Sequence, residues 1–190
     1  LHAAGSGVTS AGIQIARLLG ARRILVTAGS EAKLARAREL GATHGILYNQ
    51  GDFVRAAREA TQGEGVDVVF DHVGGETFER SLKLLKRGGR IVLCGATSGP
   101  EAKINLRALF FKQLSVLGST MGSLAELASL LPYFESGALR PVVDRTFPLA
   151  EAPAAQEFLA RRGAFGKLVL TVGTGARDVP HPPRAQEARQ

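Results

Sequence analysis

Short apolar runs alternate with segments of helical period along most of the chain, and this alternation limits the fold more than any other feature. The runs predict strands at 22–29, 43–48, 66–73, 90–97, 114–121, 142–149 and 166–172. The segments between them predict helices at 8–19, 30–40, 52–61, 76–89, 105–112, 123–137 and 151–162. Strands that alternate with helices form parallel sheets covered on both faces. The sequence therefore predicts a doubly wound α/β fold with a mostly parallel sheet, whose middle strands are buried on both faces.

The two ends of the chain depart from this pattern. The glycine-rich turn of LHAAGSGVTSAG begins so early that at most residues 1–3 remain for the strand that normally precedes it. We expect this first strand to be truncated. Because its neighbours would then lack a hydrogen-bonding partner, we expect the natural protein to be longer, or the chain to fold poorly alone. Residues 173–190 contain three prolines and no apolar period, so we predict a domain at 1–172 and a disordered tail at 173–190.

The glycine-rich turn is an incomplete G-x-G-x-x-G pattern. Gly5 and Gly7 are present, but Ser10 occupies the third position, so the pattern alone is weak and also fits an ordinary turn. Its position before a long helix favours binding, because the amides of Gly7, Val8 and Thr9 would face outward toward a diphosphate. The hydroxyls of Ser6 and Thr9 would add donors. No Lys-Ser or Lys-Thr pair follows, so nucleotide hydrolysis is not supported.

The end of the second predicted strand bears on the choice of nucleotide. NAD sites place an acidic residue there to bind the ribose hydroxyls. Here the positions are Ala28, Gly29 and Ser30, and the first acid is Glu31 inside the helix. Without that carboxylate, Ser30 and Lys33 can approach a 2′-phosphate, which favours NADP(H), with NAD(H) still possible. Alternatively, Ser30 is only a helix cap and Lys33 a solvated lysine. The missing acid also argues against a methyltransferase.

Composition excludes several other classes of function. Lys and Arg outnumber Asp and Glu by 24 to 17, but they are scattered and no nucleic-acid recognition motif accompanies them. No apolar run approaches the ~20 residues of a membrane span. The single cysteine, Cys94, cannot form an internal disulfide, which predicts a reducing compartment such as the cytoplasm.

Several residues suggest chemistry that the sequence does not support. We expect Cys94 to be a buried small hydrophobe, and Phe110 and Phe111 to pack against the sheet or a neighbour. Asp71 and His72 resemble half of a catalytic triad, but no nucleophile motif accompanies them. The remaining histidines are too far apart in sequence to suggest a metal site.

Six motifs, in order, resemble the cofactor-binding half of the medium-chain dehydrogenase/reductases. They are AAGSGVTSAGIQIA, TAGSEAKLARARELGA, GVDVVFDHVGGETFERSL, GGRIVLCGATSG, LSVLGSTMGS and FGKLVL. The branch that they resemble is the group of zinc-type alcohol dehydrogenases and quinone oxidoreductases. The resemblance covers residues 1–172 and implies a Rossmann domain that binds a nicotinamide dinucleotide.

The resemblance also implies which residues contact the cofactor. These are Ser6, Gly7, Val8 and Thr9 at the diphosphate; Ser30, Lys33 and Tyr48 at the adenosine end; His72, Val73, Gly74, Gly95, Ala96 and Thr97 beside the ribose and nicotinamide; Ser119 and Thr120 near the carboxamide; and Gly166 and Lys167 closing over the cofactor. In this family a separate catalytic domain comes first and supplies any zinc ligands and most substrate contacts. No such domain is present in these 190 residues, so no catalytic residue or metal ligand is assigned, and we expect the isolated chain to be inactive.

The resemblance implies the cofactor domain of an NADPH-dependent oxidoreductase. Hydride would pass between nicotinamide and a small-molecule quinone, enone or carbonyl/alcohol substrate. Two alternatives are a zinc-dependent alcohol dehydrogenase fragment and a non-catalytic nucleotide-binding or sensor module. The resemblance further implies a homodimer joined through the edge strand at 114–121.

Overall fold

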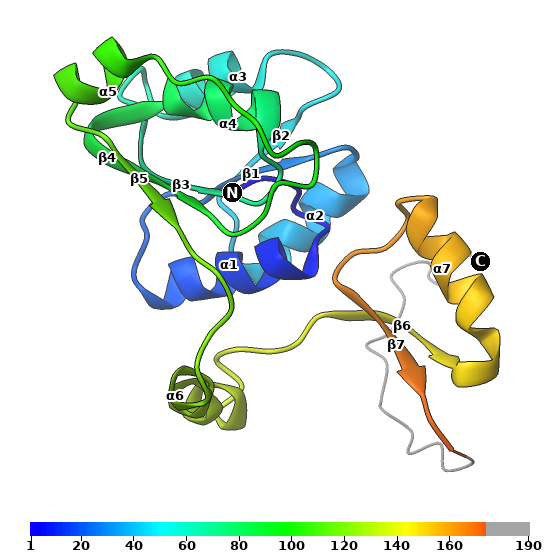
Figure 1. The fold of residues 1–190 in the computed structure, drawn as a ribbon. Helices are drawn as coiled ribbons and strands as arrows, with labels where there is room; N and C mark the ends of the chain where they lie inside the picture. Colours follow the sequence, from blue (N-terminus) through cyan, green and yellow to red (C-terminus); the bar gives the residue numbers. More distant parts are fainter. Residues whose placement is uncertain (174–190) are drawn as a thin grey trace, which may run out of the picture.

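The computed structural model describes residues 1–173 as an α/β fold in which paired strands are parallel (Figure 1). The strands are β1 (Leu25–Ala28), β2 (His44–Leu47), β3 (Val66–Asp71), β4 (Leu85–Leu93), β5 (Ser115–Gly118), β6 (Val143–Pro148) and β7 (Lys167–Thr171). They pair in the orders β1-β2, β3-β4-β5 and β6-β7. The prediction of an α/β fold with parallel strands is confirmed. The predicted tail lies outside the described residues, apart from Gly173.

Helices connect these strands, and short polar side chains mark where most of them begin. The helices are α1 (Gly7–Leu18), α2 (Glu31–Leu40), α3 (Phe53–Ala60), α4 (Gly75–Leu82), α5 (Leu106–Phe111), α6 (Leu124–Glu135) and α7 (Ala152–Ala160), and a 3₁₀ turn η1 (Leu149–Glu151) precedes α7. The capping side chains, each accepting from a first-turn amide, are those of Ser6, Ser30, Asp52, Asn105 and Ser123. α6 includes Pro132, as the sequence predicted.

The predicted helix at 76–89 is wrong in its second half. α4 ends at Leu82, and β4 already begins at Leu85. Leu84 is buried with Ile46 and Phe53, whereas Leu85 belongs to a different cluster of buried residues. Two successive leucines that enter different core clusters fit an extended backbone, in which side chains alternate across the strand.

The sheet is interrupted between β1 and β3. Residues 1–4 lie beside β1: the Leu1 amine donates to the Leu25 carbonyl at 2.9 Å and the Ala4 amide to the Thr27 carbonyl at 2.8 Å. Within the described residues, no backbone hydrogen bond joins residues 1–4 to β3. A cavity of about 670 Å³ lies here, lined by α1, β1 and β3. Residues 1–4 form no strand, and Val68 of β3 is 53% exposed, although the sequence predicted middle strands buried on both faces.

The unit of β6, α7 and β7 contacts the glycine-rich end of the fold. The Gly166 amide donates to the Gly5 carbonyl at 2.8 Å, and Ser6 forms a parallel bridge with Gly166. Gln14 of α1 exchanges two hydrogen bonds with the backbone of Arg140, at 3.0 and 2.9 Å. These contacts place the start of β7 beside the head of α1.

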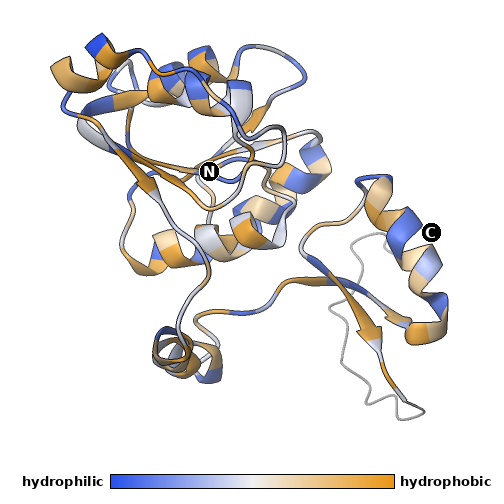
Figure 2. Ribbon diagram, viewed as in Figure 1, coloured by the Kyte–Doolittle hydropathy of each residue, from blue (hydrophilic) through white to orange (hydrophobic). Residues whose placement is uncertain are grey.

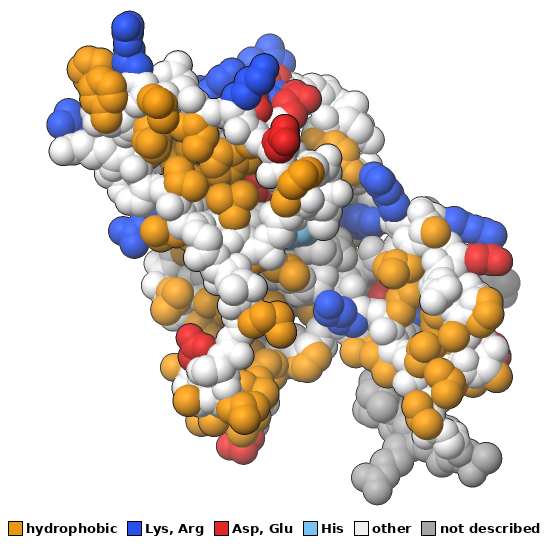
Figure 3. Space-filling view, viewed as in Figure 1, with side chains coloured by type: hydrophobic (Ala, Val, Ile, Leu, Met, Phe, Trp, Pro, Cys, Tyr) orange, Lys and Arg blue, Asp and Glu red, His pale blue; other side chains and the backbone are white. Residues whose placement is uncertain are grey.

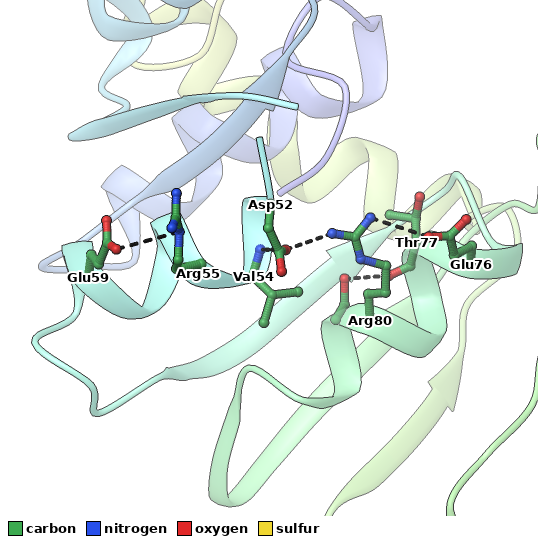
Figure 4. A network of polar contacts seen from close by, with 8 residues as sticks. Asp52, Val54, Arg55, Glu59, Glu76, Thr77 and Arg80 are labelled. Carbon is green, nitrogen blue, oxygen red and sulfur yellow. Dashed lines mark hydrogen bonds and ion pairs between the residues drawn. The ribbon is translucent and has the colours of Figure 1, made fainter. Parts of the chain in front are cut away.

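An ion-pair network ties α3 to α4 (Figure 4). Arg80 donates to Asp52 at 2.6 Å and to Glu76 at 3.3 Å, and its guanidinium lies 4.5 Å from the centre of the Phe53 ring. The Val54 amide, and after it the hydrogen bond from Arg80, lower the pKa of Asp52.

The ribbons of α5, α6 and β5 include hydrophobic residues (Figure 2), and apolar side chains gather on the surface of the molecule (Figure 3), among them exposed side chains of these three elements. Phe110 and Phe111 are 65% and 64% exposed and stack on each other, so they do not pack against the sheet, and packing against a neighbour stays a prediction. Cys94 is also exposed, contrary to expectation. The physical reason is position: Cys94 follows the last residue of β4, and α5 carries no buried residue.

Candidate functional site

The head of α1 forms an open cradle under two lysines. A methyl group built on Gly7 would lie 2.4 Å from Lys167 Cε, and one built on Gly5 would lie 3.0 Å from Lys33 Cδ. The amides of Gly7 and Val8 have no hydrogen-bond acceptor within residues 1–173. Two free amides at a helix N-terminus and two cations suit an anion. The room left by the missing side chains of Gly5 and Gly7 is occupied in the structure by the Lys33 and Lys167 side chains, which would have to shift for a bound anion.

The hydroxyl groups of Ser6 and Thr9 form hydrogen bonds within the protein and do not face the open side of the glycine turn. The Ser6 hydroxyl accepts from the Thr9 amide at 3.0 Å, which caps α1. Thr9 is fully buried and its hydroxyl donates to the carbonyl of His2. The expectation that the Thr9 amide and hydroxyl face a ligand is therefore corrected. The reason is that the β-branched side chain turns back onto the preceding residues.

The end of β1 brings together the hydroxyls of Ser30 and Tyr48, and the nearby carboxylate of Glu31 points to a different partner. The Ser30 hydroxyl caps α2, 3.4 Å from the Lys33 amide. Tyr48 follows β2, and its hydroxyl oxygen would lie 2.6 Å from a methyl group on Gly29. The carboxylate of Glu31 pairs with Arg38 at 2.6 Å. Lys33 donates to the carbonyl of Arg162 at 2.6 Å, so it must leave that bond to contact a phosphate.

The ends of β3 and β4 meet at His72. Its Nε2 lies 3.1 Å from both the Ser6 and Thr9 hydroxyl oxygens. Its carbonyl accepts from the amide and hydroxyl of Thr97, both at 3.3 Å. These contacts join the first turn, the end of β3 and the end of β4 into one site.

The glycines beside His72 allow close packing of these strand ends. A methyl group on Gly74 would lie 3.0 Å from Ala96 Cα, and one on Gly95 would lie 3.2 Å from the His72 carbonyl oxygen. The Val73 carbonyl accepts from the Ser98 amide at 2.8 Å. The predicted group of Val73, Gly74, Gly95 and Ala96 is thus brought together.

The remaining residues that were predicted to contact the cofactor lie at different distances from the site. Gly166 and Lys167 lie at the cradle, as described above. The Ser119 amide donates to the Leu93 carbonyl at 2.8 Å, which places Ser119 beside the end of β4. Thr120 is exposed and forms no hydrogen bond within the described residues that would bring it to the site.

Sequence reasoning did not assign two buried polar residues to the site. His2 lies 3.1 Å from the Thr27 hydroxyl and 2.8 Å from that of Ser81, and burial lowers the pKa of His2 to about 3. Asp71 is fully buried; its Oδ1 accepts from the Val73 and Gly74 amides at 2.7 and 3.3 Å, while its Oδ2 has no partner within residues 1–173. Their only sequence signal is position, at the ends of the first and fourth predicted strands.

The site fits a nucleotide and does not fit a metal. The free amides of Gly7 and Val8 and the neighbouring lysines match the phosphates of a dinucleotide. Over residues 1–173, no group of three or more His, Cys, Asp or Glu side chains is placed to hold a metal ion. In the same part of the chain, no helix is long and apolar enough to cross a membrane.

Comparison with known proteins agrees with this geometry. The profile of the zinc-binding dehydrogenase family matches residues 7–136. The chain is 41% identical to the spectinabilin polyketide synthase system protein NorB of Streptomyces orinoci, over 90% of this chain and 8% of that protein. It is 35% identical to a quinone oxidoreductase of Pseudomonas aeruginosa, over 89% of this chain and 54% of that protein. A crystal structure of an NAD-dependent alcohol dehydrogenase is 46% identical, with a TM-score of 0.83, over 90% of this chain and 50% of that one.

These likenesses confirm the resemblance to the cofactor-binding half of medium-chain dehydrogenase/reductases. The chain spans at most about half the length of these three proteins, and the matched part has the Rossmann-type fold described above. The chain belongs to the zinc-binding dehydrogenase family.

Proposed function

We propose that this chain is the cofactor domain of an NADPH-dependent oxidoreductase. The observation that supports this most is the head of α1, where the amides of Gly7 and Val8 have no acceptor within residues 1–173 and Lys167 lies against Gly7. A dinucleotide's diphosphate matches that site in charge and in its need for donors. When bound, the nicotinamide supplies the hydride chemistry. The chain's own residues bind and orient it.

A preference for NADP(H) over NAD(H) is the finer part of the proposal. It is supported by the end of β1, where Ser30 and Lys33 stand and no carboxylate faces the ribose position, because Glu31 pairs with Arg38. Lys33 would exchange its bond to the Arg162 carbonyl for a 2′-phosphate. That exchange replaces a neutral acceptor with a charged one, and charge-assisted hydrogen bonds are the stronger kind.

Fluorescence titration with NADPH and NADH tests both parts. We expect tighter binding of NADPH, and we expect Lys33→Ala to reduce that preference without abolishing NADH binding. Exposed Lys103→Ala is the matched control, because it removes the same charge away from the site. Much tighter binding of NADH by the unaltered chain would refute the phosphate assignment at Ser30 and Lys33. No binding of either nucleotide would refute the whole proposal.

For the substrate, we propose a small quinone, enone or carbonyl/alcohol. One relative is a quinone oxidoreductase and one similar structure an alcohol dehydrogenase, which supports hydride transfer to or from such groups. In a zinc-dependent alcohol dehydrogenase, the zinc ligands would come from outside the described residues. NADPH oxidation by quinones that persists after treatment with a zinc chelator supports the reductase. Tight NADPH binding without turnover of any quinone, enone or aldehyde by a longer protein that contains this chain supports a non-catalytic module.

We further propose a cytoplasmic homodimer joined through residues 114–121. Within residues 1–173, β5 pairs with β4 alone, and its Val116 and Leu117 are 38% and 43% exposed. A free parallel edge with apolar side chains favours pairing with a second copy. Val116→Lys should shift the protein from dimer to monomer in sedimentation velocity, whereas Thr171→Lys on β7 should not. A monomeric unaltered protein at micromolar concentration would refute this interface. The cytoplasm is proposed from the single, exposed cysteine.

A further inference from the structure

We propose that α5 of one copy of this chain packs against α6 of a second copy, so that each dimer contains two equivalent contacts of this kind. The contact is apolar at its centre, and the positive charge of α5 faces the negative charge of α6. This inference rests on the homodimer through residues 114–121 proposed above and adds two helices to that interface. It does not depend on the cofactor.

The first step is the exposed apolar face of α6. Four large apolar side chains follow one another along this helix at spacings of three, four and three residues: Leu124, Leu127, Leu131 and Phe134. This spacing puts all four on one side of the helix. Each is at least 38% exposed, and within residues 1–173 α6 buries none of its residues. Because helices in proteins are stabilised chiefly by packing of their apolar face, this face indicates a partner.

The second step is a similar surface on α5. Leu106 is exposed, as are the stacked rings of Phe110 and Phe111. Apolar side chains are visible in Figure 3 at the places where Figure 1 has α5 and α6. The molecule therefore presents two exposed apolar surfaces, one on each helix.

The third step is the direction of β5, because it decides which helices meet. α5 ends at Phe111, before the start of β5 at Ser115. α6 begins at Leu124, beyond the end of β5 at Gly118, so the two helices lie at opposite ends of this strand (Figure 1). A two-fold dimer uses the same surface of both copies, so two β5 strands that pair along it run in opposite directions. The start of each β5 then lies beside the end of the other, which brings α5 of one copy to α6 of its partner.

The fourth step is the charge on the two helices. The charged residue of α5 is Arg107, and those of α6 are Glu126 and Glu135. Glu126 accepts from the Ser123 amide at 2.7 Å in the helix cap. Neither Arg107 nor Glu135 forms an ion pair within residues 1–173. Two copies of α5, or two copies of α6, would repel each other. Charge complementarity therefore favours the pairing of α5 with the partner's α6.

Charge reversal in the full chain, followed by sedimentation velocity, tests this contact. Arg107→Glu and Glu135→Arg each place like charges at both contacts of a homodimer, so each should weaken the dimer by about fivefold, as expected for two exposed charge pairs. In an equimolar mixture of these two variants, opposite charges meet at both contacts of the heterodimer. The mixture should therefore dimerise nearly as tightly as the unaltered protein. Arg55→Glu and Glu59→Arg, the same reversals at an exposed pair on α3, are the matched controls and should leave the dimer unchanged.

The outcomes separate this contact from the proposals on which it builds. A monomeric unaltered protein would overturn the β5 interface and this contact with it. A dimer that Val116→Lys disrupts, but that both charge reversals leave unchanged, would overturn the contact of α5 with α6 alone. Weakening that the mixture does not relieve would also overturn it, because the charges would then not meet across two copies. NADPH binding should be the same in every variant, so a failure of the cofactor site would appear separately, as a dimer that binds no NADPH.

Discussion

The same substitution, glycine to alanine, should have opposite consequences at Gly7 and Gly166. At Gly166 the backbone φ is 96° and a methyl group would lie 2.2 Å from the Val142 carbonyl oxygen, which itself accepts from the Lys167 amide. The left-handed backbone costs an L-residue about 1–2 kcal/mol. Relieving the overlap with backbone costs about 1–3 kcal/mol more. Gly166→Ala should therefore lower the free energy of unfolding by about 2–5 kcal/mol.

At Gly7 the methyl group would meet only the flexible end of Lys167, 2.4 Å from Cε. That side chain can move, so Gly7→Ala should change the free energy of unfolding by less than about 1 kcal/mol. The methyl group would instead occupy the cradle, and NADPH should bind at least about tenfold more weakly, which is about 1.4 kcal/mol.

Urea unfolding and NADPH titration of both variants test this pair. A Gly7→Ala variant that unfolds as early as Gly166→Ala would mean that the head of α1 is packed rather than open. A Gly7→Ala variant with unchanged NADPH affinity would mean that the diphosphate binds elsewhere. Either result would refute the reasoning about the cradle.

Three further predictions concern stability and titration. His2 is buried and neutral, with a pKa of about 3 in the folded chain against about 6.5 in the unfolded chain, so the unfolded chain binds more protons between these pH values. The free energy of unfolding should therefore fall by on the order of 4 kcal/mol as the pH is lowered from 6.5 to 3. In urea unfolding, the stability of His2→Gln should depend much less on pH, and an equal pH dependence of the variant and the unaltered protein would contradict this. Adding Val-Leu-Val before Leu1 should fill the cavity between β1 and β3 and raise the melting temperature, whereas adding Asp-Pro-Asp should not; equal effects of the two would argue against that use of the cavity. Arg80→Gln should raise the pKa of Asp52 only partly toward its ordinary value in an NMR titration, because the Val54 amide remains as the largest cause; a full return would assign the shift to Arg80.

Features that depend on near neighbours in the chain could be predicted from the sequence. The helix caps at Ser6, Ser30 and Asp52 each bond an amide two or three residues ahead, so short stretches of sequence are enough to predict them. Hydrophobic period likewise predicted the alternation of strands and helices. The same local pattern misplaced the start of β4, because the extended run from Leu85 is decided by which core cluster each leucine enters.

The site itself was predicted as a set of strand ends but not as a set of contacts. His72 meets Ser6 across 66 residues, and Lys167 lies over Gly7 although they are 160 positions apart (167 − 7). Neither contact leaves a mark in the local sequence, because it depends on how the strand ends pack. For the same reason the burial of the Thr9 hydroxyl and the exposure of Cys94 were not foreseen. The sequence by itself determined that a glycine turn opens a helix in a parallel α/β fold. Only the tertiary structure decided which side chains face that turn, since long-range packing chooses the neighbours of each strand end.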